Sequence, residues 1–173
     1  MTKLISLRIK NYKAFEDTVF EPDSKGLTVI IGNNGSGKTS LWEVLSLLAR
    51  LANGWQIGWL MRQFAGRGRN FLGCLPWHRA DQEFSLELHL RSDKPNRNGD
   101  IFYRVGWTAN AETGEPQLTT EELHWDKSRL LSYDRTTARY VKPSPVQWQT
   151  PLSWVFPVAL LCFLHSAGVY GQY

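Results

Sequence analysis

Eight residues that include three glycines, residues 32–39 (GNNGSGKT), separate an apolar β-rich run from an amphipathic stretch. Before them, residues 27–31 (LTVII) are almost entirely apolar and β-branched, which is typical of a strand buried on both faces. After them, apolar side chains recur at the spacing of one helix face until Asn53 and Gly54 end the pattern. The stripe consists of Leu41, Val44, Leu45, Leu48 and Leu51. A strand, a glycine loop and a helix are therefore expected in that order.

The glycine loop, residues 32–39, satisfies the pattern G-x-x-x-x-G-K-[ST] of a Walker A motif. Backbone N–H groups can surround a polyphosphate only where side chains leave room, which Gly32, Gly35 and Gly37 provide. The helix that begins near Lys38 directs its unpaired N–H groups and positive dipole end at the phosphates. We expect Lys38 to act as the catalytic lysine on the β and γ oxygens, and the Thr39 hydroxyl to ligate Mg²⁺. The expected nucleotide-binding residues are Gly32, Asn33, Asn34, Gly35, Ser36, Gly37, Lys38, Thr39 and Ser40.

The bound nucleotide is predicted to be ATP, because the guanine-reading sequence Asn-Lys-x-Asp occurs nowhere in the chain. The competing interpretation is a glycine-rich loop that fits the pattern by accident. The flanking strand and helix patterns are independent of the loop, and both favour nucleotide binding.

The second half of the chain is predicted to form an antiparallel meander. Apolar residues alternate with polar ones over 84–91, and Ile101, Tyr103, Val105 and Trp107 alternate with Phe102, Arg104 and Gly106. Two shorter strands are expected around Leu123 and around Leu131. Near the N-terminus, residues 4–9 should form a strand with Ile5, Leu7 and Ile9 on one face, followed by a short strand at 18–20. Residues 55–80 contain four glycines and are expected to be irregular.

Residues 9–15 (IKNYKAF), a spacer and residues 27–41 resemble the N-terminal lobe of the SMC/RecF-like branch of ABC-type ATPases. That branch includes bacterial AAA-family predicted ATPases. The resemblance implies an α/β P-loop NTPase fold, an ABC/SMC-head-like N-terminal lobe with an appended antiparallel β-meander. It also implies ATP hydrolysis coupled to a conformational change, and a homodimer through the ATPase head in the full-length protein. Asn11 and Lys13 would lie near the nucleotide, the alternative being that both belong to an exposed strand end.

The chain departs from that family where ATP hydrolysis is concerned. No Asp-Glu dipeptide follows an apolar strand, so the second acidic anchor for Mg²⁺ is not found. We expect a truncated ATPase that binds ATP and Mg²⁺ but hydrolyses ATP poorly. The alternative is a non-catalytic, nucleotide-regulated module that binds protein or DNA.

The predicted organisation is a nucleotide-binding domain over residues 1–142 and an uncharged apolar tail over residues 143–173. Within the domain, residues 1–54 carry the strands, loop and first helix, 55–82 an irregular lobe, and 83–142 the β-rich insert. The tail has no Asp, Glu, Lys or Arg, and residues 155–164 are nearly all apolar but too few for a membrane span. We therefore expect no membrane partner, and we expect the terminus to be truncated.

Two features of the sequence bear on ligands other than ATP. Arginines and aromatic residues interleave between residues 50 and 79, which permits DNA binding, but glycine-broken spacing favours a solvated loop lobe instead. Cys74 and His78 lie four residues apart without a second ligand pair, so zinc binding is not expected. Two cysteines and the absence of a signal peptide predict a cytoplasmic location.

Overall fold

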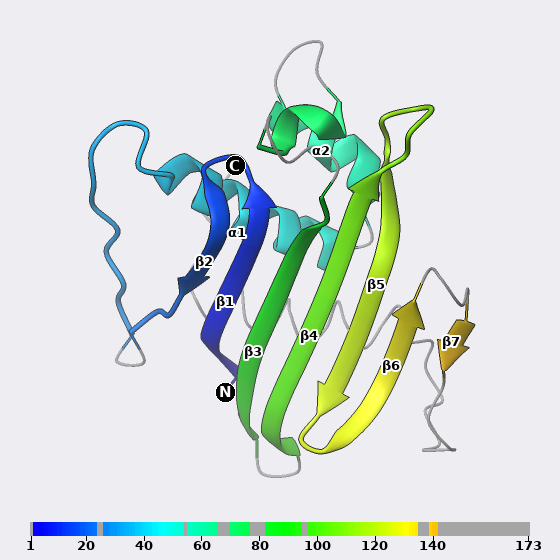
Figure 1. Cartoon of the computed structure of the whole chain (residues 1–173). Helices are drawn as coiled ribbons and strands as arrows, with labels where there is room; N and C mark the ends of the chain where they lie inside the picture. The colour runs from blue at the N-terminus through cyan, green and yellow to red at the C-terminus, as the bar shows by residue number, and fades with distance from the viewer. Residues whose placement is uncertain are drawn as a thin grey trace.

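One antiparallel sheet runs through the chain in the computed structural model, which describes residues 2–23, 26–53, 55–65, 70–76, 82–94, 97–134 and 139–141. Within these residues the strand order is β2-β1-β3-β4-β5-β6-β7, and every neighbouring pair is antiparallel (Figure 1). The strands are β1 (Thr2–Tyr12), β2 (Phe15–Phe20), β3 (Phe84–Lys94), β4 (Arg97–Ala109), β5 (Pro116–Trp125), β6 (Ser128–Asp134) and β7 (Arg139–Val141).

The predicted meander is present, and it is continuous with the N-terminal hairpin. β1 pairs with β2 on one side and with β3 on the other, so the strands after residue 83 extend the first hairpin into one sheet. The sequence indicated β3 to β6 and the short strand at β2, whereas β7 was not predicted. A mixed α/β architecture with an antiparallel sheet is therefore confirmed.

The alternation in β1 is interrupted by a bulge. Leu4 pairs with Leu90 but Ser6 pairs with His89, which leaves Ile5 as an extra residue in the ladder. As a result Leu4, rather than Ile5, is buried together with Leu7 and Ile9. The expectation that Ile5 shares the face of Leu7 and Ile9 is wrong for this reason.

Two helices lie on one face of the sheet and form the core with it. In Figure 1, α1 (Lys38–Ala52) lies behind the strands, and α2 (Ile57–Ala65) lies at the upper ends of β3 and β4. The 3-10 turn η1 (Phe71–Cys74) completes the layer. Alternate residues of β3 and β4 and one face of α1 form this core, which includes Leu41, Val44, Leu47, Leu48, Phe84, Leu86, Leu88, Ile101, Val105 and Trp107.

The irregular lobe expected over residues 55–80 is wrong in part. α2 forms despite Gly58, and it buries Leu60, Met61 and Ala65. Burial of three side chains at helical spacing offsets the roughly 1 kcal/mol cost of one glycine within a helix.

The buried strand expected over residues 27–31 is absent. These residues are extended without belonging to any strand, and Leu27, Val29 and Ile31 are 80%, 70% and 87% exposed. A strand needs neighbours for its backbone groups and a layer over its side chains. The described residues supply neither, because no strand of their sheet pairs with residues 27–31 and Leu27, Val29 and Ile31 stay exposed.

Candidate functional site

The glycine loop runs directly into α1. Gly35 and Gly37 have φ angles of +83° and +89°, in the left-handed region that favours glycine. The N–H of Ser36 donates to the Asn33 carbonyl at 3.2 Å, which turns the chain back towards the helix. The loop residues from 32 to 36 are all exposed, so their amides are accessible from solvent.

Two glycines of the loop have close neighbours, and only Gly37 combines such a neighbour with a left-handed φ. A Cβ atom at Gly37 would lie 2.9 Å from the Phe15 ring and 3.7 Å from the Ala14 side chain. A Cβ atom at Gly32 would lie 2.7 Å from the Ser36 hydroxyl oxygen. The loop is therefore closely folded at both ends, with the turn between β1 and β2 packed beside the start of α1.

The start of α1 is suited to an anion. The first helical hydrogen bond is donated by Leu41 to the Gly37 carbonyl, so the preceding N–H groups have no acceptor within the helix. No side chain caps this end, and no acidic residue lies in the first turn. The positive end of the helix dipole is thus left uncompensated at the glycine loop.

The Lys38 ammonium group lies across the glycine loop. Its Nζ donates to the carbonyl oxygens of Gly32 at 2.6 Å and Asn33 at 2.7 Å, and lies 3.3 Å from the Ser36 hydroxyl oxygen. These contacts hold a positive charge at the loop without a carboxylate partner in the contacts described. Thr39 is exposed at the same end of the helix, whereas Ser40 is buried.

Asn11 and Lys13 lie at the turn that packs against Gly37, but their side chains are engaged elsewhere. The Lys13 ammonium donates to both carboxylate oxygens of Glu43, at 2.8 and 2.6 Å, and to the Phe64 carbonyl at 2.7 Å. The Asn11 amide donates to the Glu83 carbonyl at 2.9 Å. Both have positive φ, of 54° for Asn11 and 47° for Lys13, so their contacts fix a strained turn. In this structure they position the turn rather than point into the loop.

Two residues near the loop were missed by the sequence analysis. Phe15 supplies the ring that faces Gly37, and Glu43 anchors Lys13 while accepting a hydrogen bond from the Tyr12 hydroxyl at 3.0 Å. Both contacts join residues far apart in the chain, and no spacing rule relates them. Glu43 is the one acidic residue of α1, and this was the only signal that the sequence offered for it.

A hollow of about 390 Å³ opens beside the loop. Lys38 and Thr39 form its polar end, and the remainder is apolar: Ile30, Leu41, Trp42 and Leu45. Trp42 is 50% exposed and Ile30 is 45% exposed. The hollow therefore joins the cationic end of α1 to an apolar surface formed by the first turns of α1 and Ile30.

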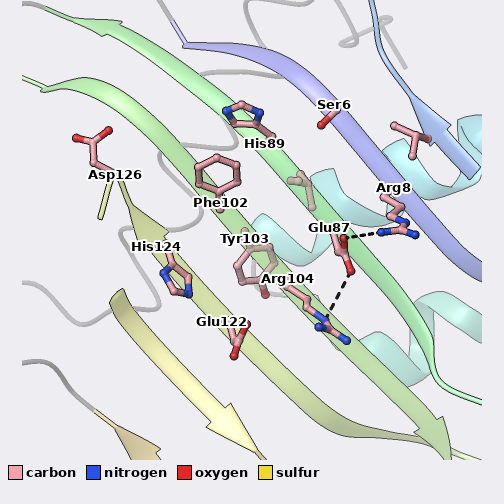
Figure 2. A pocket seen from close by; sticks show the side chains of 12 residues that line it. Ser6, Arg8, Glu87, His89, Phe102, Tyr103, Arg104, Glu122, His124 and Asp126 are labelled. Atoms are coloured by element: carbon pink, nitrogen blue, oxygen red, sulfur yellow. Dashed lines mark ion pairs between the residues drawn. The ribbon is translucent and has the colours of Figure 1, made fainter. Parts of the chain in front are cut away.

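A larger hollow of about 570 Å³ lies on the outer face of the sheet, away from the helices (Figure 2). His89 and Phe102 stack there, with ring centroids 4.2 Å apart. Glu87 there lies 3.8 Å from an Arg8 nitrogen and 3.8 Å from an Arg104 nitrogen, and Glu122 and Asp126 add further negative charge to the lining. This surface is less suited to a polyphosphate than the loop at Lys38, because carboxylates balance its cations.

The remaining sequence predictions fall partly outside the described residues. Of the interleaved arginines, Arg62 pairs with Glu115 at 3.0 Å and Arg50 donates to Gln63 at 2.9 Å, while Arg67, Arg69 and Arg79 lie outside. Cys74 is buried, and His78 is not described. No cluster of three metal-binding side chains occurs in the described ranges. Among the helices of those ranges, none has the length and apolar character needed to cross a bilayer.

Comparison with known proteins identifies the same region. The family model described as an AAA domain matches residues 6–49, which span β1, β2, the glycine loop and most of α1. No curated protein matches the chain. The match covers the segment in which Lys38 and the start of α1 face the loop. Residues 6–49 are thus similar to an AAA domain, which supports an AAA-type P-loop ATPase family and a nucleotide-binding function of the ATPase type.

Proposed function

We propose that residues 32–39 bind the phosphates of ATP with Mg²⁺. The observation that carries the proposal is the position of the Lys38 ammonium, held by the Gly32 and Asn33 carbonyls at the uncapped start of α1. An anion at this point would meet a full positive charge, exposed loop amides and the helix dipole together. No other described surface combines these three features.

The residues have separate roles in this proposal. Amides of residues 34–39 would surround the phosphates, and Lys38 would stabilise the charge on the β and γ oxygens. Thr39 would hold Mg²⁺, because its hydroxyl is exposed beside Lys38 and is a hard oxygen ligand of the kind that Mg²⁺ prefers. Bound Mg²⁺ would neutralise phosphate charge. Asn11 and Lys13 would act on the nucleotide by fixing the turn that packs against Gly37.

We further propose that this site belongs to an ATPase of the SMC/RecF-like type that couples hydrolysis to a conformational change, and that the present chain hydrolyses ATP poorly. Phosphoryl transfer requires an acidic metal anchor in addition to the Thr39 hydroxyl. The one carboxylate on α1, Glu43, is held by Lys13 and Tyr12. A turnover number comparable to that of ordinary ATPases, about 1 s⁻¹ or more, would contradict this part of the proposal.

Nucleotide titration of the wild type and of Lys38→Ala, each with and without Mg²⁺, tests the binding proposal. Loss of one charge-assisted contact to phosphate should weaken ATP binding about 10- to 100-fold. Lys127→Ala, at an exposed turn between β5 and β6, is the matched control and should leave the affinity unchanged. Equal affinities for Lys38→Ala and the wild type would contradict the proposal.

A further inference from the structure

An uncovered apolar surface adjoins the glycine loop beside the first turns of α1. It is formed by residues 27–31 together with Trp42 and Leu45, and we call it the uncovered face. Its largest exposed fractions are 87% at Ile31, 80% at Leu27 and 70% at Val29. Exposed apolar side chains this close together mark a contact surface in a soluble protein.

Among the described residues, no strand pairs with the backbone of residues 27–31. No backbone hydrogen bond joins these residues to a strand within the described ranges. Their sequence, LTVII, has the β-branched and apolar composition of a sheet strand. Such a segment presents a row of donors and acceptors that an extended chain can satisfy.

Helix α1 supports a second layer on this side. One face packs against the sheet through Val44 and Leu47, which are fully buried. Trp42 is 50% exposed and lines the hollow beside Ile30 together with Leu45, which also packs against the core. An exposed Trp next to exposed aliphatic side chains leaves apolar area on α1 that a second layer would cover.

We propose that residues 158–164 (VALLCFL) of this same chain cover the uncovered face and pair as a strand along residues 27–31. The two segments are matched in chemistry, since residues 143–173 contain no Asp, Glu, Lys or Arg. An uncharged apolar segment buries its side chains without desolvating any charge. Pro157 lies just before the segment, at a position where a strand tolerates proline.

The connection is long enough to reach. β7 ends at Val141 at one edge of the sheet, and β2, which precedes residues 27–31, forms the other edge. Six spacings between strands of about 4.8 Å give a width of about 30 Å. Residues 142–157 can span about 50 Å when extended, which exceeds that width.

Disulfide trapping in the full chain tests the proposal, with the native Cys162 as the probe in the tail. Val29→Cys, Ile30→Cys and Ile31→Cys are made separately and oxidised mildly, and peptide mapping identifies the linked pairs. Phe102→Cys is the matched control, because Phe102 is 44% exposed and Ile30 is 45% exposed, but Phe102 lies on the opposite face of the sheet. Cys74 is buried and does not compete.

We expect at least one of the three variants to link to Cys162 within one chain, at least tenfold faster than Phe102→Cys. Equal rates at all positions would overturn the proposal. Linkage between two chains would overturn it in favour of a second copy as the occupant.

Hydrogen exchange of the unsubstituted chain gives an independent measurement. If residues 158–164 pair with residues 27–31, the amides of Val29 to Ile31 should exchange at least tenfold more slowly than unpaired amides. Leu161→Asp should abolish that protection, because it places a charge in the buried layer. Unprotected amides in the wild type would overturn the proposal. Neither measurement depends on nucleotide binding, so the proposed function can fail or hold separately.

Discussion

At the scale of single residues, hydrogen bonds and burial shift the pKa values of the described acids in opposite directions. Asp17 is exposed and Asp100 is half-buried, and hydrogen bonds from Arg8 and Arg91 hold the pKa of each carboxyl below its ordinary value. Glu121 behaves in the opposite way. Desolvation raises the pKa of its carboxyl above the ordinary 4.5, although a hydrogen bond donated by the Tyr103 hydroxyl at 2.8 Å opposes the shift.

Glu121 therefore predicts a pH dependence of stability. The pKa of Glu121 is raised in the folded state, so its protonated carboxyl adds to the free energy of unfolding. This contribution is fully present below pH 4.5 and is lost as the pH rises through the pKa of the folded state. Glu121→Gln should melt at a higher temperature than the wild type at pH 7, and the difference should shrink as the pH falls towards 4.5. Thermal unfolding followed by circular dichroism from pH 4 to pH 7 measures this. A difference that grows on acidification would contradict it.

At the scale of elements, the glycine loop is held by what packs against it. Gly35 and Gly37 have nearly the same φ, but a Cβ atom at Gly35 would meet nothing within 4 Å, while one at Gly37 would meet the Phe15 ring. A substitution at Gly35 therefore reports backbone strain alone, whereas one at Gly37 reports backbone strain together with the contact with Phe15.

Gly37→Ala is expected to destabilise the fold more than Gly35→Ala. A left-handed φ costs alanine about 1–2 kcal/mol at either position, and the contact with Phe15 should add about 1–2 kcal/mol at Gly37. Urea unfolding of both variants measures the difference. A double-mutant cycle with Phe15→Ala should remove the additional cost at Gly37 and leave Gly35→Ala unchanged. Additive effects at Gly37 and Phe15 would show that the ring is not the cause.

The pair formed by Lys13 and Glu43 joins three elements, because Lys13 follows β1, Glu43 lies on α1, and the Phe64 carbonyl belongs to α2. Its side chains are only 24% and 14% exposed. Glu43→Gln leaves a half-buried ammonium without its charge partner and should cost about 2 kcal/mol. Glu115→Gln breaks a more exposed pair with Arg62 and should cost less than about 1 kcal/mol. Urea unfolding compares the two, and equal costs would contradict the anchoring role of Glu43.

An element could be predicted from the sequence where neighbouring residues are enough to cause it. Alternation placed β3 and β4 because each strand has one face on the core, and the stripe through Leu41 and Val44 placed α1. Residues 27–31 carry an equally strong strand pattern but lie exposed, because pairing needs a neighbour that no local pattern supplies. The same limit applies to the site: the motif located Lys38, whereas the contact between Phe15 and Gly37 depends on tertiary packing.

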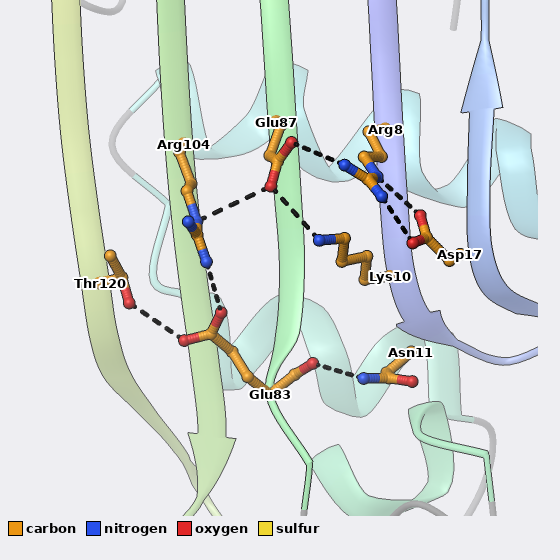
Figure 3. Close-up of polar contacts among 8 residues, drawn as sticks. All are labelled: Arg8, Lys10, Asn11, Asp17, Glu83, Glu87, Arg104 and Thr120. Atoms are coloured by element: carbon orange, nitrogen blue, oxygen red, sulfur yellow. Dashed lines mark hydrogen bonds and ion pairs between the residues drawn. The ribbon is translucent and has the colours of Figure 1, made fainter.

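At the scale of the whole molecule, charged side chains on the outer face connect the strands across the sheet (Figure 3). Asp17 on β2 accepts two hydrogen bonds from Arg8 on β1, each 2.7 Å long. Glu87 on β3 lies 3.7 Å from Lys10 and 3.8 Å from both Arg8 and Arg104. One carboxylate thus lies among three cations from two neighbouring strands.

Glu87→Gln should therefore lower stability through repulsion among those three cations. The groups are partly exposed, so the expected cost is about 0.5–1 kcal/mol at low salt. It should fall towards zero in about 1 M NaCl, where the screening length is about 3 Å. Glu112→Gln, at an exposed turn, removes the same charge without disturbing an ion pair in the described contacts, and should have little effect at either salt concentration. A cost for Glu87→Gln that is independent of salt would assign its role to packing, because only a Coulombic contribution is screened by ions.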